Sequence, residues 1–245
     1  MKVPFEYCAD EYAAFRPGYP TALYDFLAAR CSLDRDSTII DIGAGTGKGS
    51  VRLLERGFRV VAFDRSEKML GAGRNKGNQH HDIVCSSAEQ IPLGDSTADL
   101  ILCAQSFHWF ASSNTLAEFA RLVKPTGCLA LFWNTRAPEP IHQQEYERLI
   151  RKFNPDHVCG YRNRDWTRII EENGLLRTVE QRKFEHSESM TIERWKGLAR
   201  STSYIRCIGE ERLEAFELEL EEALERCETS IDIQYRTEVW LAEPG

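Results

Sequence analysis

The feature that most constrains the fold of this 245-residue chain is a short apolar run that ends in alternating glycines. This run is Ile39-Ile40-Asp41-Ile42-Gly43-Ala44-Gly45-Thr46-Gly47. Such a run predicts a buried strand, and the glycines after it allow positive φ and a close approach of the backbone to a ligand. Helical spacing follows, so we predict a strand, a turn and a helix, the unit that builds doubly wound sheets.

Further apolar runs alternate with segments of helical spacing up to about residue 135. The predicted strands are 38–42, 59–63, 82–85, 98–104 and 128–133, and the predicted helices are 20–30, 47–56, 66–74 and 115–123. Alternation of this kind predicts an α/β fold with a doubly wound, mainly parallel sheet.

The pattern changes after Asn134, where a proline-rich break at 137–140 precedes a polar helical segment. The predicted helices here are 142–153, 165–173, 191–200 and 210–227, and the predicted strands are 175–186 and 231–241. Since no linker or repeat separates the two parts, we predict a single domain over 1–245. Its helical cap is predicted to consist of about 137–163 and 190–228.

Charge and cysteine content exclude several classes of function. The formal net charge of -7 argues against a basic surface for nucleic acid. The eight cysteines are scattered without a CxxC pair, which argues against a zinc site and suits a reducing compartment. No apolar stretch reaches the roughly 18 residues of a membrane span. We therefore predict a soluble, cytoplasmic protein that binds neither nucleic acid nor membrane and holds no metal. The sequence does not indicate its oligomeric state.

The glycine spacing excludes two common phosphate-binding loops. A Walker A loop needs Gly-x-x-x-x-Gly-Lys-Ser/Thr, but for the pair Gly47-Lys48 the first glycine is replaced by Ile42 and the serine or threonine by Gly49. The dinucleotide pattern Gly-x-Gly-x-x-Gly fails as well, because Lys48 stands where its third glycine is required. A pyrophosphate ligand is thus disfavoured.

Polar residues follow the next strands at the points where those strands end. Asp64 ends the second strand, and Ser87-Ala88-Glu89 follows the third. Because carboxyl ends of parallel strands meet at one edge, these residues suit a nucleoside, with Asp64 on the ribose and Glu89 near the base. Two alternatives stay open: a tight turn without ligand, and Asp64 as an ordinary charge at a helix start capped by Ser66.

These motifs resemble those of the class I S-adenosylmethionine-dependent methyltransferases over about residues 5–135. The matching positions are 41–47, Asp64, Ala88-Glu89 with Ile91-Pro92, and 122–127. Residues 12–20 and 104–110 resemble the small-molecule branch that includes trans-aconitate methyltransferase. The resemblance implies a Rossmann-like, seven-stranded sheet whose last strand is antiparallel, and S-adenosyl-L-methionine as cofactor. One departure is Cys128, which stands where the family's turn has glycine.

The resemblance also implies roles for individual residues. Cofactor-binding residues would be Tyr12, Arg16, Asp41, Gly43, Ala44, Gly45, Gly47, Asp64, Arg65, Ser87, Ala88, Glu89 and Gln105. Catalytic contacts would come from Gln105, His108 and Trp109, and substrate contacts from Trp133, Arg200 and Tyr204. His108 is either a general base or part of the site wall.

The predicted function is methyl transfer to a small molecule, with O-methylation of a carboxylate or hydroxyl favoured. The alternative is a regulatory module that binds the nucleoside cofactor without turnover. A nicotinamide-dependent oxidoreductase is disfavoured by the glycine spacing. The acceptor itself is not predicted, because one sheet of this kind hosts many acceptors.

Overall fold

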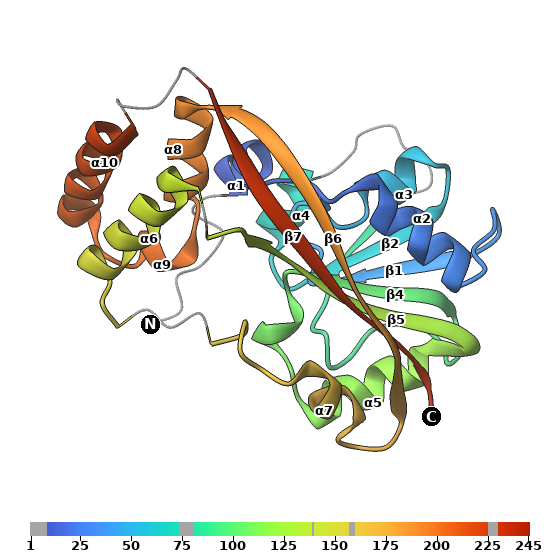
Figure 1. Ribbon diagram of the computed structural model, residues 1–245. Helices are drawn as coiled ribbons and strands as arrows, with labels where there is room; N and C mark the ends of the chain where they lie inside the picture. The colour runs from blue at the N-terminus through green and yellow to red at the C-terminus, as the bar shows by residue number, and fades with distance from the viewer. Residues whose placement is uncertain (1–8, 74–80, 139, 157–159, 225–229) are drawn as a thin grey trace. The chain divides into compact units, whose positions relative to one another are not determined.

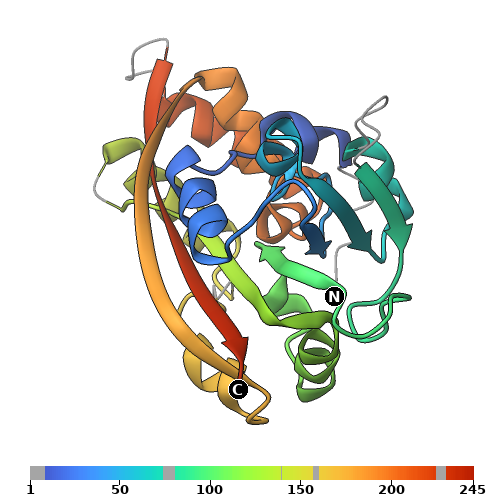
Figure 2. The same ribbon diagram turned by 90° about the vertical axis from the view of Figure 1, so that its right-hand side faces the viewer.

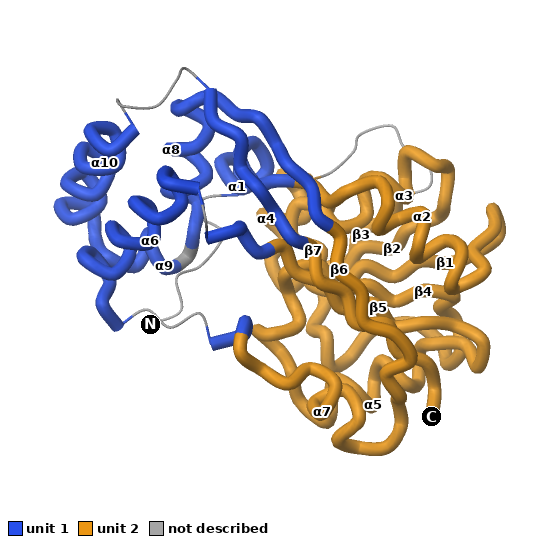
Figure 3. Tube along the Cα trace, viewed as in Figure 1, with its two compact units in different colours: residues 1–17, 135–162, 185–236 blue, residues 18–134, 163–184, 237–245 orange. Residues whose placement is uncertain are grey.

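The computed structural model describes residues 9–73, 81–138, 140–156, 160–224 and 230–245. The chain divides into two compact units, which Figure 3 colours separately. We call residues 18–134, 163–184 and 237–245 the sheet unit, and residues 1–17, 135–162 and 185–236 the helical unit. The prediction of a single domain over 1–245 stays a prediction.

A seven-stranded sheet has the order β3-β2-β1-β4-β5-β7-β6 (Figures 1 and 2). Its strands are β1 (Thr38–Ile42), β2 (Arg59–Asp64), β3 (His81–Cys85), β4 (Ala98–Ala104), β5 (Val123–Arg136), β6 (Leu176–Thr191) and β7 (Ser230–Pro244). Strands β1 to β5 pair in parallel, with Ile39 opposite Val60 on one side and Leu100 on the other. The predicted mixed sheet with an antiparallel last strand is confirmed.

The central strands β1, β2 and β4 are buried on both faces, which explains why they appear in the sequence as unbroken apolar runs, whereas the edge strand β3 is partly exposed. One face packs against α2 (Thr21–Arg30) and α3 (Val51–Glu55), which contribute Leu27 and Leu53 to the core. Helices α4 (Glu67–Gly73) and α5 (Ser113–Leu122) also bury apolar side chains.

The predicted helix 47–56 is shorter in the structure. Helix α3 begins at Val51, because Gly47 has a φ of +74° that a right-handed helix excludes. The predicted cap at Ser66 is confirmed, since its Oγ accepts a hydrogen bond from Met69 N at 3.3 Å. Position 74, the predicted end of that helix, lies outside the described residues.

Strands β5, β6 and β7 are longer than predicted. Strand β5 begins at Val123, because Val123 already pairs with Ala98 ahead of the apolar core of the strand. Strand β7 alternates buried and exposed residues over most of its length. Because every second residue is polar, the apolar residues alone do not show where the strand begins and ends. Strand β6 carries only two fully buried residues, Leu176 and Met190.

The helical unit contains α1 (Ala9–Phe15), α6 (Ile141–Phe153), α8 (Ile192–Arg200), α9 (Ser203–Arg206) and α10 (Glu210–Leu224) (Figure 1). Its core includes Tyr146, Trp195 and Phe216, with Phe15 packed against it. The short helix α9 was not predicted. The predicted cap segments contribute α6 and α8 to α10, and positions 139, 157–159 and 225–228 of those segments lie outside the described residues.

Helix α7 (Trp166–Glu171) belongs to the sheet unit and is capped by Asp165, whose side chain accepts a hydrogen bond from Arg168 N at 3.0 Å. Within the described part of the chain, no helix combines the length and apolarity that crossing a membrane requires. The same residues contain no cluster of three potential metal ligands.

Candidate functional site

The glycine loop after β1 has the geometry that its sequence predicts. Gly43, Gly45 and Gly47 have φ values of +66°, +56° and +74°. Ala44 N donates to Phe63 O at 3.0 Å, which joins the loop to the end of β2. A side chain at Gly47 would meet nothing within 4 Å, so open space lies on that side of the loop. The loop therefore exposes backbone at the carboxyl ends of β1 and β2.

Gly43 is required for a second reason, because the end of β4 packs directly on it. A Cβ at this position would lie 2.7 Å from Ser106 Cβ and 2.9 Å from Phe110 Cε1. Ser106 Oγ in turn donates to Ile42 O at 2.9 Å. These contacts fix the turn after β4 against the glycine loop.

Replacement of Gly43 by alanine is expected to lower the free energy of unfolding by about 2–4 kcal/mol, from positive-φ strain and overpacking together. Cofactor affinity should fall with it. Gly57→Ala is the matched control, since Gly57 has a φ of +83° but no atom within 4 Å of its Cβ position. Urea unfolding and calorimetric titration measure both effects. Equal destabilisation by the two variants would contradict the packing argument.

Asp41 is a fully buried carboxylate beneath this loop. Its Oδ2 accepts a hydrogen bond from Ser50 Oγ at 2.6 Å, and its Oδ1 has no partner among the described residues. Burial, and then the nearby charge of Asp64, raises the pKa of Asp41 to about 7. The unpartnered oxygen of a buried acid is a strong acceptor for a cationic group.

Asp64 ends β2 and binds the backbone of the two loops beside it. Its Oδ2 accepts from Gly45 N at 2.8 Å and its Oδ1 from Ser66 N at 2.8 Å. Burial raises its pKa, and the two N–H donors oppose that shift. Each carboxylate oxygen keeps a further lone pair after these bonds. Asp64 is thus both an organiser of the loop and a possible acceptor for ligand hydroxyls.

The loop after β3 is mostly exposed. Ser87 and Glu89 are exposed and hydrogen-bonded to each other, whereas Ala88 is buried. Arg65, next to Asp64, is exposed. The structure therefore places Ser87, Ala88 and Glu89 at the third strand end as predicted, and their role stays a prediction.

The turn after β4 is built around Gln105, a non-glycine residue with a φ of +56°. Its Nε2 donates to Asn134 O at 3.0 Å. Asn134 in turn donates to Gly18 O at 2.8 Å and accepts from Thr237 Oγ1 at 2.6 Å. A positive φ strains the backbone of a non-glycine residue. Such strain persists only where surrounding contacts enforce it, and it is often found at functional sites. No pattern in the sequence indicates that Asn134 and Thr237 support this turn.

His108 lies in a short 3-10 helix, Phe107–Trp109, and is held by a tryptophan. Trp133 Nε1 donates to His108 Nδ1 at 3.1 Å. Burial, and then the charge of Arg164, lowers the pKa of His108 to about 4. Trp133 stacks on Trp166 with ring centroids 4.6 Å apart, while Trp109 is 46% exposed. Two residues that were predicted to lie in the site, His108 and Trp133, are therefore hydrogen-bonded to each other.

The remaining predicted residues lie in the helical unit. The Arg16 guanidinium lies 4.8 Å from the centroid of the Tyr12 ring, so the two residues share a face as predicted. Arg200 pairs with Glu11 at 3.5 Å and with Glu217 at 3.4 Å. Tyr204 accepts a hydrogen bond from Arg136 at 2.9 Å.

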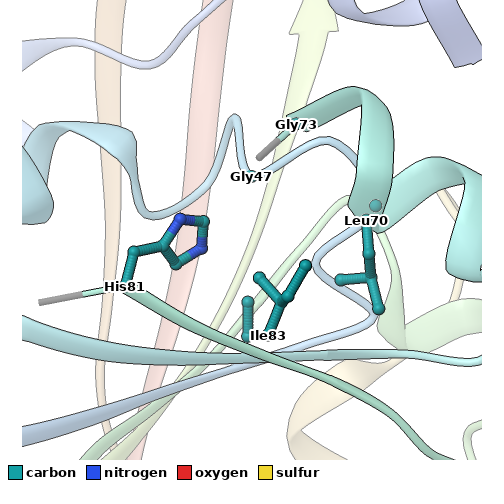
Figure 4. A pocket seen from close by; sticks show the side chains of 7 residues that line it. Gly47, Leu70, Gly73, His81 and Ile83 are labelled. Atoms are coloured by element: carbon teal, nitrogen blue, oxygen red, sulfur yellow. The ribbon is translucent and has the colours of Figure 1, made fainter. Parts of the chain in front are cut away.

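A small hollow lies beside the glycine loop within the sheet unit (Figure 4). Its lining includes Gly47, Leu70, Gly73, His81 and Ile83. It is narrower than a water molecule. A Cβ at Gly73 would lie 2.3 Å from Thr46 O, so the end of α4 packs closely on the loop. This hollow is a packing feature behind the loop.

Comparison with known proteins matches the same region. A family model described as a methyltransferase domain matches residues 40–131. An uncharacterized methyltransferase-like protein of Schizosaccharomyces pombe is 32% identical over 213 residues, covering 86% of this chain and 82% of the relative. An uncharacterized methyltransferase of Mycobacterium tuberculosis is 38% identical over 136 residues, covering 56% of this chain and 54% of that protein.

Among solved structures, one provisionally described as a type II methyltransferase, from Anaeromyxobacter dehalogenans, aligns with a TM-score of 0.71. It is 22% identical and covers 94% of this chain and 98% of its own. Sheet order, glycine loop and homology together define a class I methyltransferase fold. The chain belongs to the S-adenosylmethionine-dependent methyltransferases, and S-adenosylmethionine is its cofactor.

The residues at the strand ends fit this cofactor. The unpartnered Oδ1 of Asp41 suits the amino group of its methionine part, and the lone pairs of Asp64 suit ribose hydroxyls. The open side of Gly47 allows a ligand to approach the loop backbone.

Proposed function

We propose that this methyltransferase acts on a small molecule and methylates a carboxylate oxygen; a hydroxyl oxygen is the second candidate. The observation that carries the proposal is the hydrogen bond from Trp133 Nε1 to His108 Nδ1. A nitrogen that accepts this bond is unprotonated, and its lone pair is engaged. His108 is therefore poorly suited to remove a proton from a hydroxyl or an amine.

The low pKa of His108 supports the same conclusion. A histidine with a pKa of about 4 is neutral at neutral pH and is a weak base. A carboxylate acceptor is already ionised, so its methylation requires no base. In the tautomer set by Trp133, His108 Nε2 carries a hydrogen and can donate to an acceptor oxygen.

Methyl transfer needs alignment and exclusion of water more than covalent participation of the protein. The cofactor, when bound, supplies an electrophilic methyl group on a positively charged sulfur. We assign the orientation of the acceptor to Gln105, His108 and Trp109, which follow β4. The bonds of Gln105 to Asn134, and of Asn134 to Gly18, keep this turn rigid.

The cofactor-binding roles follow from the strand ends. We assign the amino group to Asp41, the ribose to Asp64 with Arg65 beside it, and the adenine to Ser87, Ala88 and Glu89. The loop residues Gly43, Ala44, Gly45 and Gly47 would contact the methionine part, and Tyr12 with Arg16 its carboxylate. The unpartnered Oδ1 of Asp41 supports the first assignment most directly.

We also assign the chain to the branch that resembles trans-aconitate methyltransferase, supported by the motifs at 12–20 and 104–110. A cytoplasmic location is supported by Cys31, Cys85, Cys103, Cys128 and Cys207, which all carry free thiols. Binding of nucleic acid is not expected with a net charge of -7.

His108→Gln is expected to lower kcat/KM for a carboxylate acceptor by less than about tenfold, because glutamine can still donate a hydrogen bond. Loss of a general base would lower it by about 10²–10⁴. Transfer of radiolabelled methyl to a panel of small carboxylic acids and matched alcohols measures the effect. Esters formed in the reaction are identified by their hydrolysis in base.

Nuclear magnetic resonance of the histidine ring provides the control. In the native protein the His108 ring should not titrate above about pH 5, and Trp133→Phe should raise its pKa by removing the donor to Nδ1. Preference for alcohols, together with a loss above 100-fold in His108→Gln, would contradict the proposal.

A further inference from the structure

One buried tryptophan of the sheet unit packs on both sides of the hydrogen bond that holds His108. Trp166, the first residue of α7, is 2% exposed. Its ring stacks on that of Trp133, the donor of this bond, with centroids 4.6 Å apart and planes inclined by 13°. The centroid of the same ring lies 5.6 Å from that of Phe107, the residue before His108. Trp166 therefore packs against the donor and against the turn that carries the acceptor.

The chain at the start of α7 restricts the position of the Trp166 ring. Asp165 caps the helix by accepting a hydrogen bond from Arg168 N at 3.0 Å, which fixes the backbone beside the tryptophan. The guanidinium carbon of the exposed Arg164 lies 5.6 Å from the centroid of the ring, within the range of a cation–π contact. A cap and a cation thus hold a ring that the sequence indicates only as part of a helix.

The tautomer of His108 depends on where the Trp133 indole is held. A neutral imidazole carries its hydrogen on one of two nitrogens, and the partner of the other nitrogen decides which one. Trp133 Nε1 can only donate, so His108 Nδ1 accepts and the hydrogen stays on Nε2. A hydrogen bond weakens steeply as it bends, so a rotation of the indole would release this tautomer. The stacked ring of Trp166 opposes that rotation.

Arg164 supports the same tautomer through its charge. After burial, this charge is the second cause of the low pKa of His108. A protonated imidazole carries hydrogen on both nitrogens and cannot accept from Trp133. By disfavouring the protonated ring, Arg164 preserves the hydrogen bond between the two side chains. The segment 164–166 thus acts on His108 both by packing and by charge.

We propose that Trp166, with Arg164 on its ring, is a positioning residue that keeps His108 Nε2–H as a donor to the acceptor oxygen. The inference rests on the proposed function and deepens it, since it names what holds the donor in place. Without the stack, His108 would also adopt the other tautomer, whose Nε2 carries a lone pair and repels a carboxylate oxygen. The segment 164–166 thereby favours an acceptor oxygen that receives a hydrogen bond over one that must give up a proton.

The test follows the His108 ring in the full-length protein without any ligand. Nitrogen-15 resonance distinguishes the ring nitrogen that carries hydrogen from the one that does not. We expect hydrogen on Nε2 alone in the native protein and a mixture of both tautomers in Trp166→Leu, which removes the stack. Trp166→Phe keeps a smaller stacked ring and should restore the native tautomer.

Arg164→Met is the second variant, because an exposed side chain can be replaced without unfolding the protein. It should raise the pKa of His108 by at least about half a unit, since it removes a positive charge near the ring. Trp240→Leu is the control. Trp240 also contacts Trp133, but edge-on, with centroids 5.6 Å apart, so its loss should leave the tautomer and the pKa of His108 unchanged.

Methyl transfer connects the tautomer with the reaction. The substrate is the small carboxylic acid that the native enzyme methylates most readily. Trp166→Leu should raise KM for this acid about tenfold and change kcat by less than about threefold, because one hydrogen bond to the acceptor is weakened. Trp166→Phe should keep KM within about twofold of the native value.

A single Nε2–H tautomer in folded Trp166→Leu, or an equal mixture of tautomers in Trp240→Leu, would overturn the inference. If Trp166→Leu does not fold, an unchanged pKa of His108 in Arg164→Met overturns it instead. Transfer of methyl to alcohols but not to acids, with mixed tautomers in Trp166→Leu, would reject the proposed function and leave the positioning role of Trp166 standing.

Discussion

Asp64→Ala is expected to abolish measurable cofactor binding, with the Kd for S-adenosylmethionine rising at least about 100-fold. The carboxylate accepts hydrogen bonds from Gly45 N and Ser66 N, so its removal loosens both loops as well as removing the proposed ribose acceptor. The free energy of unfolding should fall by about 1–3 kcal/mol, since the two N–H groups are only partly accessible to water. Calorimetric titration with S-adenosylmethionine and S-adenosylhomocysteine measures the first effect.

Asp82→Ala is the matched control. Asp82 lies on β3, opposite Val61 of β2, and forms only an exposed ion pair with Arg59. It removes the same charge without touching the glycine loop. Both Kd and stability should stay within about twofold and 0.5 kcal/mol of the native protein. Normal cofactor affinity in Asp64→Ala would refute the assignment of Asp64 to the ribose.

Asp41→Asn is expected to stabilise the protein while weakening cofactor binding. The pKa of Asp41 is about 7 in the folded protein, against 3.8 for an unperturbed aspartate. Between these values the native state binds more protons than the unfolded chain, so native stability falls as pH rises from about 4 to 7. Asparagine cannot ionise and escapes this cost, which approaches about 4 kcal/mol above pH 7. Urea unfolding from pH 4 to 8 measures it.

Cofactor affinity should depend on pH in the opposite sense to stability, and should rise as Asp41 ionises. If the ionised Oδ1 receives the amino group, acidification below about pH 7 weakens binding by up to tenfold per pH unit, and binding releases a proton. Asp41→Asn should lower affinity by about 10- to 100-fold and remove this pH dependence. Titrations in buffers of different ionisation enthalpy count the protons. A native protein that binds equally well at pH 5.5 and 8 would exclude this role.

The strands and turns of the sheet unit could be predicted well, because they depend mainly on residues that are close together in the sequence. The central parallel strands are buried on both faces, and the run 98–104 was predicted with the bounds that β4 has. The glycine loop was predictable because alternating glycines indicate a turn with positive φ, and Gly43, Gly45 and Gly47 all have positive φ. The start of α3 was wrong by four residues, because helical spacing does not reveal that Gly47 is left-handed.

The site was less predictable where its geometry depends on residues distant in the sequence. His108 and Trp133 were each chosen as site residues, but their hydrogen bond spans 25 positions and no spacing rule predicts it. That bond is what turns a candidate base into a candidate donor. The positive φ of Gln105 and its support by Asn134 and Thr237 are equally hidden in the sequence.

The division into two units has a consequence for how such an enzyme can diversify. The chain passes from one unit to the other five times, after residues 17, 134, 162, 184 and 236. Strands β5, β6 and β7 each contribute residues to both units. Neither unit is therefore a cassette that a single recombination event could exchange. Exchange of either unit between relatives would require several crossovers, at the positions where the chain passes from one unit to the other.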